Sequence, residues 1–202
     1  MQIYILDDDE QVVAANRFLL NAMGHVSLGW SCPRQFLGEL EDDKPAILLL
    51  DLAMPELDGL AVLGALQQRR STVAVILLTG HGDVPQAVEA MKLGAVDFLE
   101  KPIDARRLAT ALGQARRKVD RLTEQARVHR CFTRLSVRER EVVSLVATGL
   151  TNKAIAEQLC VAVRTVEVHR ASAMHKLSVA NMAELLNHWQ LYREKDSDSH
   201  KP

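Results

Sequence analysis

The most constraining feature of the sequence is a regular alternation, over the first hundred residues, of short apolar runs and longer amphipathic stretches. Two of the runs, AILLLD and VAVILLTG, are almost continuously apolar, which is typical of parallel strands buried on both faces. Five such units predict an α/β domain in which helices cover both faces of one parallel sheet. The expected strands are 2–6, 26–29, 46–50, 73–78 and 96–99, and the expected helices between them are 10–23, 33–41, 59–69 and 84–93.

A fifth helix is predicted to begin near Asp104, and no stop signal follows where the α/β domain should end. The stripe along this helix fits a packing helix that continues as a solvated linker helix, and it also fits a short two-chain coiled coil. Two alanines weaken the stripe, so the pattern favours the first interpretation. Its apolar or small residues, spaced alternately by four and three, are Leu108, Leu112, Ala115, Val119, Leu122 and Ala126.

From Leu135 onward the pattern changes to short helices without strands, predicted near 137–148, 151–159, 163–176 and 180–192. The chain is therefore expected to combine an α/β domain with an all-α domain. The expected boundaries are an α/β domain at 1–118, a helical linker at 119–132, a four-helix domain at 133–196 and a disordered tail at 197–202.

The net charge of −1 conceals a strong asymmetry along the chain. Residues 1–100 carry 6 Lys and Arg against 15 Asp and Glu, whereas residues 101–130 carry 9 against 3. Two modules with different partners are indicated, and the partner of the rear one is expected to be a polyanion. No apolar run approaches the ~20 residues that span a bilayer, and the three cysteines are far apart. These observations favour a cytoplasmic protein with no membrane contact and argue against a disulfide framework or a Cys-ligated metal.

Polar residues mark the ends of four predicted strands of the α/β domain. Asp7 and Asp8 follow the first strand, Asp51 ends the third, Thr79 ends the fourth and Lys101 follows the fifth. In a parallel sheet the carboxyl ends of the strands share one edge, where ligands bind. We therefore expect these five side chains, which are far apart in the sequence, to lie at one site.

The chemistry that this group of side chains suggests is transfer of a phosphoryl group to a carboxylate. Asp51 would be the nucleophile, and Asp7 and Asp8 would help to hold Mg²⁺, which prefers carboxylate oxygens. The ion would offset the repulsion among the carboxylates and the charge of the phosphoryl oxygens. Lys101 would contact the phosphate as a point charge, and the Thr79 hydroxyl would bond a phosphoryl oxygen after transfer.

The four acids of the first strand end are expected to divide into two pairs. Asp7 and Asp8 are assigned to the cation, whereas Asp9 and Glu10 fall where the first helix should begin. Because a helix N-terminus carries a partial positive charge, acids there are favourable without any ligand. Asp9 and Glu10 are therefore interpreted as helix-start residues.

The motifs ILDDDE, LLLDLAMPELDG, LLTGHGD and GAVDFLEKP, within about residues 1–120, resemble the receiver domain of bacterial two-component response regulators. The resemblance implies a flavodoxin-like fold, a further cation ligand in the backbone carbonyl of Ala53, and a switch role for Phe98 together with Thr79. It also implies a cis Lys101–Pro102 bond. A haloacid-dehalogenase-type phosphatase would carry a second acid at position 53, where this chain has an alanine. A nucleotide-binding fold would place glycines after the first strand, where this chain has acids. Both alternatives are therefore disfavoured.

The segment NKAIAEQL-CVA-VRTVEVHRASAMHKL predicts a helix, a short turn and a second helix. Val166, Ala173 and Leu177 would face inward, and the opposite face could enter a DNA major groove. A packed helical domain without DNA function remains the alternative from the pattern alone. Basic residues there would contact phosphates or bases, Glu167 could accept from cytosine, and apolar ones could meet thymine methyls. The expected DNA contacts are Lys153, Arg164, Thr165, Glu167, Val168, Arg170, Ala171, His175 and Lys176.

The stretch from LSVREREVV to ASAMHKL, within about residues 133–195, resembles the LuxR-type output domain, and the whole chain resembles regulators of the FixJ type. The resemblance implies a transcription regulator, not an enzyme, that a sensor histidine kinase phosphorylates at Asp51. Its implied partners are the kinase, double-stranded DNA, RNA polymerase and, after phosphorylation, a second copy. The rival hypotheses are a constitutive DNA-binding protein, a quorum-type regulator that binds a lipid signal, and an enzyme.

Overall fold

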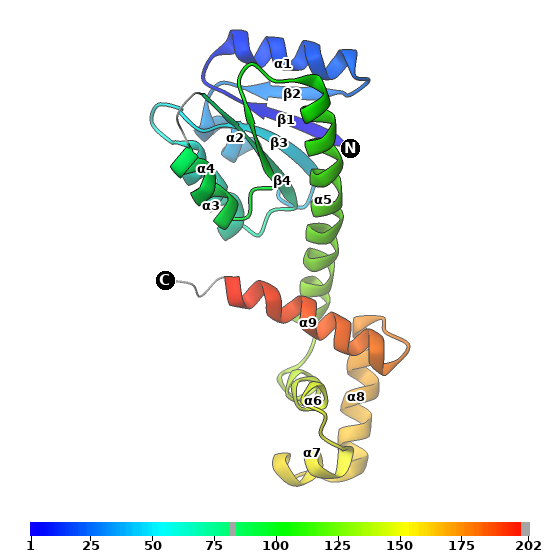
Figure 1. Cartoon of the computed structure of the whole chain (residues 1–202). Helices are drawn as coiled ribbons and strands as arrows, with labels where there is room; N and C mark the ends of the chain where they lie inside the picture. The colour runs from blue at the N-terminus through cyan, green and yellow to red at the C-terminus, as the bar shows by residue number, and fades with distance from the viewer. Residues whose placement is uncertain (81–83, 199–202) are drawn as a thin grey trace. The chain divides into compact units, whose positions relative to one another are not determined.

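The computed structural model describes residues 1–80 and 84–198, and the first part of it is an α/β domain (Figure 1). Its strands are β1 (Gln2–Leu6), β2 (Ser27–Trp30), β3 (Ala46–Asp51), β4 (Val73–Thr79) and β5 (Asp97–Glu100). All four strand pairings are parallel, and the strand order is β2-β1-β3-β4-β5. The predicted five-stranded parallel sheet is confirmed.

Helices cover both faces of this sheet, and they are α1 (Glu10–Ala22), α2 (Pro33–Glu39), α3 (Gly59–Gln68), α4 (Val84–Lys92) and α5 (Ala105–Thr133). Alternate residues of a strand point to opposite faces of the sheet. On β3, Ile47 and Leu49 belong to the core under α1 and α5, whereas Leu48 and Leu50 belong to the core under α2, α3 and α4. Every residue of β3 and β4 is buried, which explains their continuous apolar runs.

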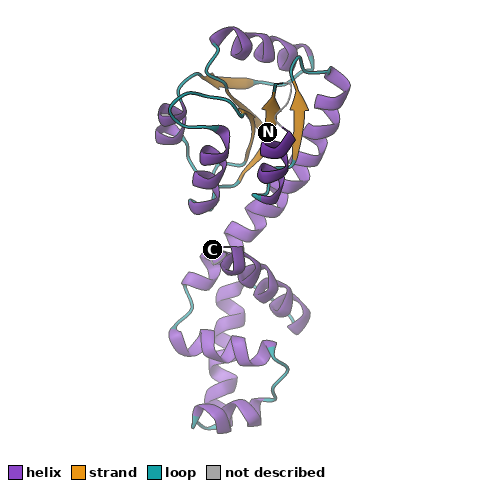
Figure 2. Cartoon of the chain, turned by 60° about the vertical axis from the view of Figure 1, so that its left-hand side comes forward, coloured by secondary structure: helices purple, strands orange, loops and turns teal. Residues whose placement is uncertain are grey.

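The described residues of the second part form helices joined by short loops and turns, with no strand among them (Figure 2). Its apolar core includes Val142, Val143, Ile155, Val166 and Leu177. The helices are α6 (Val137–Ala147), α7 (Asn152–Leu159), α8 (Val163–Leu177) and α9 (Met182–Asp198). None of the described helices is both long and apolar enough to span a bilayer.

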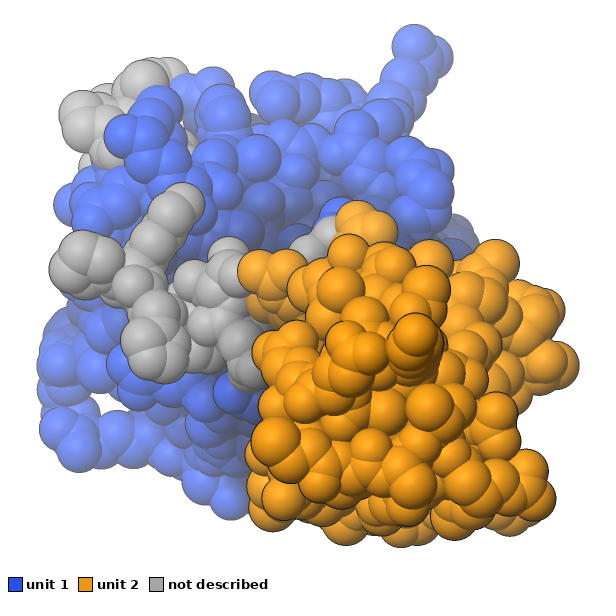
Figure 3. All heavy atoms as spheres, turned by 90° about the horizontal axis from the view of Figure 1, so that it is seen from below, with its two compact units in different colours: residues 1–123 blue, residues 124–202 orange. Residues whose placement is uncertain are grey.

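The chain divides into two compact units, Met1–Thr123 and Glu124–Pro202 (Figure 3), and the division falls inside α5. The domain limits expected from the sequence, 1–118, 119–132 and 133–196, remain a prediction. The last helix, α9, extends to Asp198, and the other residues of the expected tail, 199–202, lie outside the described part of the chain.

The apolar stripe of α5 is buried by its own chain. Leu108, Leu112, Ala115 and Val119 belong to the core of the first unit, with at most 6% of each residue exposed, which favours a packing helix over a two-chain coiled coil. The expectation that the linker is a solvated helix does not hold at Phe132 or at Val128, four residues before it. Both are fully buried in the core of the second unit.

Candidate functional site

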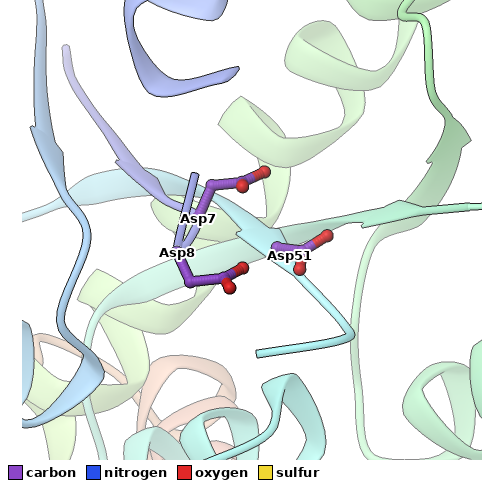
Figure 4. A group of neighbouring side chains, drawn as sticks. All are labelled: Asp7, Asp8 and Asp51. Carbon is purple, nitrogen blue, oxygen red and sulfur yellow. The ribbon is translucent and has the colours of Figure 1, made fainter. Parts of the chain in front are cut away.

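Three carboxylates meet at the edge of the sheet where the strands end (Figure 4). Asp7 and Asp8 directly follow β1 and Asp51 ends β3, so the neighbouring positions of β1 and β3 bring them together. One carboxylate oxygen from each lies within 4.8 Å of the others. Asp7 and Asp51 are buried and Asp8 is exposed, so the group opens to solvent on the side of Asp8. A group of three hard oxygen donors that reaches water on one side fits Mg²⁺, which retains several of its waters when bound.

Lys101 brings a positive charge into this acidic group. Its Nζ lies 2.6 Å from Asp7 Oδ2 and 2.6 Å from Asp51 Oδ1. Burial alone would lower the pKa of Lys101, but the hydrogen bonds to Asp51 and Asp7 and the charges of these two carboxylates together outweigh burial and raise it. The lysine is therefore charged at neutral pH. It directly follows β5, and its amide donates to the Thr79 carbonyl, which fixes its position beside the end of β4.

Asp51 is an under-compensated carboxylate, which means that Lys101 only partly offsets the cost of holding its negative charge in a buried, acidic site. Burial raises its pKa, the hydrogen bond and charge of Lys101 lower it, and the charges of Asp7 and Asp8 raise it again, with a net rise. The Ala53 amide donates to Asp51 Oδ2 at 3.1 Å and leaves the other oxygen on Lys101. A negative charge held at the edge of a sheet with few donors is suited to accept an electrophile.

Of the two residues expected to act as a switch, Thr79 ends β4 and Phe98 is the second residue of β5, where it pairs with Leu77 of β4. The Thr79 side chain is buried, and its hydroxyl donates to the Gly80 carbonyl at 3.0 Å. Phe98 is 38% exposed, although its neighbour Leu99 is almost fully buried. The Lys101–Pro102 bond is cis, as expected. The switch role of Thr79 with Phe98 and the cation role of the Ala53 carbonyl stay predictions.

The pair α7 and α8 forms the expected helix–turn–helix. The turn begins with Cys160 in the left-handed conformation (φ 53°) and contains Val161 and Ala162. Val166, Ala173 and Leu177 are fully buried, which confirms the inner face of α8. The opposite face of α8 is solvent-exposed, and its exposed residues are Arg164, Glu167, Val168, Ala171 and His175.

The predicted DNA-contact residues differ in how exposed they are and in whether their side chains already form hydrogen bonds. Lys153 on α7 is exposed, and Thr165 is half-buried. Arg164 donates to Glu167 Oε2 at 3.1 Å, with 85% of the arginine side chain exposed. Arg170 donates to Asn152 Oδ1 at 3.2 Å.

Two family models match the chain and together cover most of its length. "Response regulator receiver domain" matches residues 3–113, and "Bacterial regulatory proteins, luxR family" matches residues 133–188. The chain is a response regulator. It belongs to the regulators that join a receiver to a LuxR-type DNA-binding domain, and it is a phosphorylation-dependent transcription factor of a two-component system rather than an enzyme.

Curated relatives share this arrangement over nearly the whole of the regulator. The tetrathionate response regulatory protein TtrR of Salmonella typhimurium is 45% identical, with 93% of this chain and 91% of TtrR covered. The transcriptional regulatory protein FixJ of Azorhizobium caulinodans is 39% identical, with 92% and 90% covered. Among solved structures, the response regulator StyR matches with a TM-score of 0.60 and 33% identity, covering 95% of this chain and 98% of StyR. Full-length FixJ from B. japonicum matches at 0.55 and 36%, covering 94% and 96%.

One buried carboxylate of the regulator was not assigned a role from the sequence. Glu139 on α6 is 4% exposed and accepts from Lys176 Nζ at 2.7 and 2.8 Å and from the Ser172 hydroxyl at 2.6 Å. The Ser136 amide donates to it as well, at 2.7 Å, which completes a capping box at the start of α6. The S-x-x-E spacing of Ser136 and Glu139 could have revealed the cap, but not the link to α8.

The Glu139 network bears directly on Lys176. Burial alone would raise the pKa of Glu139, but the hydrogen bonds from Lys176, Ser172 and Ser136 lower it to about 2. Glu139 is thus ionised at neutral pH and forms an ion pair with Lys176. Through this ion pair α6 holds the C-terminal half of α8 in place. The prediction that Lys176 also contacts a DNA phosphate stays a prediction.

Proposed function

We propose that Asp51 is the phosphoacceptor of this response regulator. A carboxylate oxygen of Asp51 attacks the phosphorus of a phosphohistidine on the sensor kinase. The P–N bond breaks, its electron pair stays with the histidine nitrogen, and an acyl phosphate forms. The observation that carries this proposal is the placement of Lys101 Nζ, 2.6 Å from both Asp7 and Asp51 beside a third carboxylate.

We further propose that Asp7, Asp8, Asp51 and the Ala53 carbonyl hold Mg²⁺. When bound, the ion would neutralise charge on the phosphoryl oxygens. Lys101 is positioned to pair with the phosphate, and the Thr79 hydroxyl can exchange the Gly80 carbonyl for a phosphoryl oxygen. The phosphoryl group adds roughly 1.5 to 2 negative charges, which biases Thr79 and the exposed Phe98 toward a second arrangement.

The output of the switch, in this proposal, is DNA binding through the exposed face of α8. Arg164, Glu167 and Val168 lie near the start of α8, where a recognition helix meets base edges. Lys153 and Arg170 would position the helix by phosphate contacts. We assign a homodimer to the phosphorylated state, contact with RNA polymerase to transcription control, and a cytoplasmic location to a chain that meets both kinase and chromosome.

Incubation with a small-molecule phosphodonor and Mg²⁺, followed by intact-mass measurement and a DNA titration, tests the proposal. We expect one added phosphoryl group and tighter DNA binding. Asp51→Asn should abolish labelling, whereas the matched variant Asp9→Asn should label normally because Asp9 only caps α1. Labelling of the Asp51→Asn protein, or DNA affinity that is indifferent to labelling, would refute the switch.

Control variants separate the roles of the surrounding residues. Asp8→Asn should raise the Mg²⁺ concentration needed for labelling, since it removes one donor at the open side of the group. Arg164→Ala should weaken DNA binding at unchanged labelling. An Arg164→Ala protein with normal DNA affinity would show that α8 does not contact DNA through this face.

A further inference from the structure

The last third of α5, residues 124–133, is structurally a helix of the DNA-binding unit. Val128 and Phe132 are fully buried in the same core as Val142, Ile155 and Leu177. Arg140 of α6 also donates to the Phe132 carbonyl at 3.3 Å. The matched family model begins only at residue 133, so this helix adds to the domain that the model describes.

Residues 124–133 of α5 contact α9 where the two helices cross (Figure 1). Phe132 stacks on Tyr192 with ring centroids 4.3 Å apart and 14° between planes, and His129 stacks on the same tyrosine at 5.5 Å. Trp189 packs against Phe132 at 5.9 Å. Aromatic contacts of this kind stabilise by burial and by ring geometry together.

A group of charged and titratable side chains lies beside the aromatic stack. Arg127 on α5 is held by Glu124, one turn before it, through two hydrogen bonds of 2.8 and 2.7 Å. Its Nη2 lies 3.2 Å from Nε2 of His188 on α9, and Glu124 Oε1 lies 4.0 Å from the same nitrogen. His188 is 8% exposed, and its buried Nδ1 finds no hydrogen-bond partner among the described residues.

This geometry fits one protonation state of His188. Because a guanidinium can only donate, a hydrogen bond between Arg127 and Nε2 requires a neutral ring with its proton on Nδ1. A second proton would set two donors and two positive charges against each other at 3.2 Å. The charged groups that act on the ring are Arg127 and Glu124 from α5 and Glu184 from α9 itself. Burial and the charge of Arg127 lower the pKa of His188, and the charges of Glu124 and Glu184, which raise it, do not cancel this effect.

We propose that Glu124, Arg127 and His188 form an acid-sensitive latch between α5 and α9. With a neutral ring, His188 accepts from Arg127 and holds α9 on the last third of α5, and protonation of the ring breaks that hydrogen bond. Because α9 also packs on α6 and α8, opening the latch loosens the support of the recognition helix. The effect on DNA binding rests on the proposed function, but the latch itself does not.

The two tryptophans of the chain allow the latch to be tested in the full-length protein. Trp30 lies in the receiver and Trp189 in α9, so a Trp30→Phe background leaves Trp189 as a reporter of the DNA-binding unit alone. In this background we expect the denaturant midpoint of Trp189 fluorescence to fall as the pH is lowered from 7.5 to 5.5. His188→Gln keeps an acceptor for Arg127 but cannot take up the proton, so its midpoint should stay level.

The matched control is His25→Gln, the same replacement in the receiver, which should retain the pH dependence of the parent. Equal pH dependence in His188→Gln and its parent, or a level midpoint in the parent, would overturn the latch. Ring ¹⁵N shifts of the unmodified protein give a second measurement that needs no variant at this position. At pH 7 they should report a neutral His188 with the proton on Nδ1, and a charged ring or the other tautomer would also overturn the proposal.

Discussion

Each unit of the regulator contains a buried carboxylate beside a lysine, and the two sites are built in opposite ways. Glu139 receives hydrogen bonds from a lysine, a hydroxyl and an amide, and its pKa falls to about 2. Asp51 shares one lysine with Asp7, lies close to Asp8, and has a raised pKa. The fully hydrogen-bonded Glu139 stabilises its unit, whereas the under-compensated Asp51 suits the cation binding and phosphoryl transfer proposed for it.

The largest expected effect comes from removing Glu139, the carboxylate whose oxygens accept several hydrogen bonds. Glu139→Ala leaves Lys176 without its ion-pair partner and removes one of the two hydrogen bonds of the α6 capping box, so the DNA-binding unit should lose about 3–5 kcal/mol of unfolding free energy. Urea unfolding followed by Trp189 fluorescence in the Trp30→Phe background measures it. The control is Glu141→Ala on the same helix, whose pair with Arg138 is solvent-exposed, and it should cost less than about 1 kcal/mol. Similar losses in both variants would contradict the comparison.

The pH dependence of the DNA-binding unit should report the same network. The pKa of Glu139 is about 2 when folded and 4.5 when unfolded, so its stabilisation is fully present above pH 4.5 and is lost as the pH falls toward 2. The shift corresponds to about 3 kcal/mol, an order-of-magnitude figure. This window lies below that of the His188 latch. In Glu139→Gln the loss between pH 4.5 and 2 should largely disappear, and an unchanged acid profile would exclude Glu139 as its source.

The smallest effect should have the opposite sign. Because the pKa of Asp51 is raised, its ionised form destabilises the folded receiver, and this penalty vanishes only as the pH falls through the folded pKa. Asp51→Asn should therefore stabilise the receiver at neutral pH, by roughly 1 kcal/mol, while it abolishes labelling. Trp30 fluorescence in a Trp189→Phe background measures the gain. A destabilised Asp51→Asn receiver would mean that Asp51 is a structural carboxylate like Glu139.

The receiver site could be predicted from the sequence because its residues follow parallel strands, whose carboxyl ends share one edge of the sheet. Buried parallel strands are recognisable as continuous apolar runs, and residues at their carboxyl ends must meet at one edge. Asp7, Asp51 and Lys101 were placed together in this way. Asp9 was assigned to the helix start by the same local logic, and it does cap α1 through the Gln11 amide.

The Glu139–Lys176 pair and the latch could not be predicted in the same way. Glu139 and Lys176 are 37 residues apart, and Arg127 and His188 are 61 apart, on helices whose mutual packing no local pattern determines. A charged residue that is saturated by distant partners looks, in sequence, like any solvated charge. Val128 and Phe132 did carry a signal, since their spacing of four is helical, but at about 100° per residue they lie on the side of the helix opposite the stripe that ends at Ala126.

The burial of Val128 and Phe132 has a consequence for how such regulators can be recombined. A chimera that joins a foreign receiver to this protein at residue 133 would discard two residues that fill the core of the DNA-binding unit, together with Arg127. A junction at the boundary between Thr123 and Glu124 would transplant that core complete. Exchange of receivers, in the laboratory or in evolution, should therefore succeed with breakpoints inside the long helix rather than at its end.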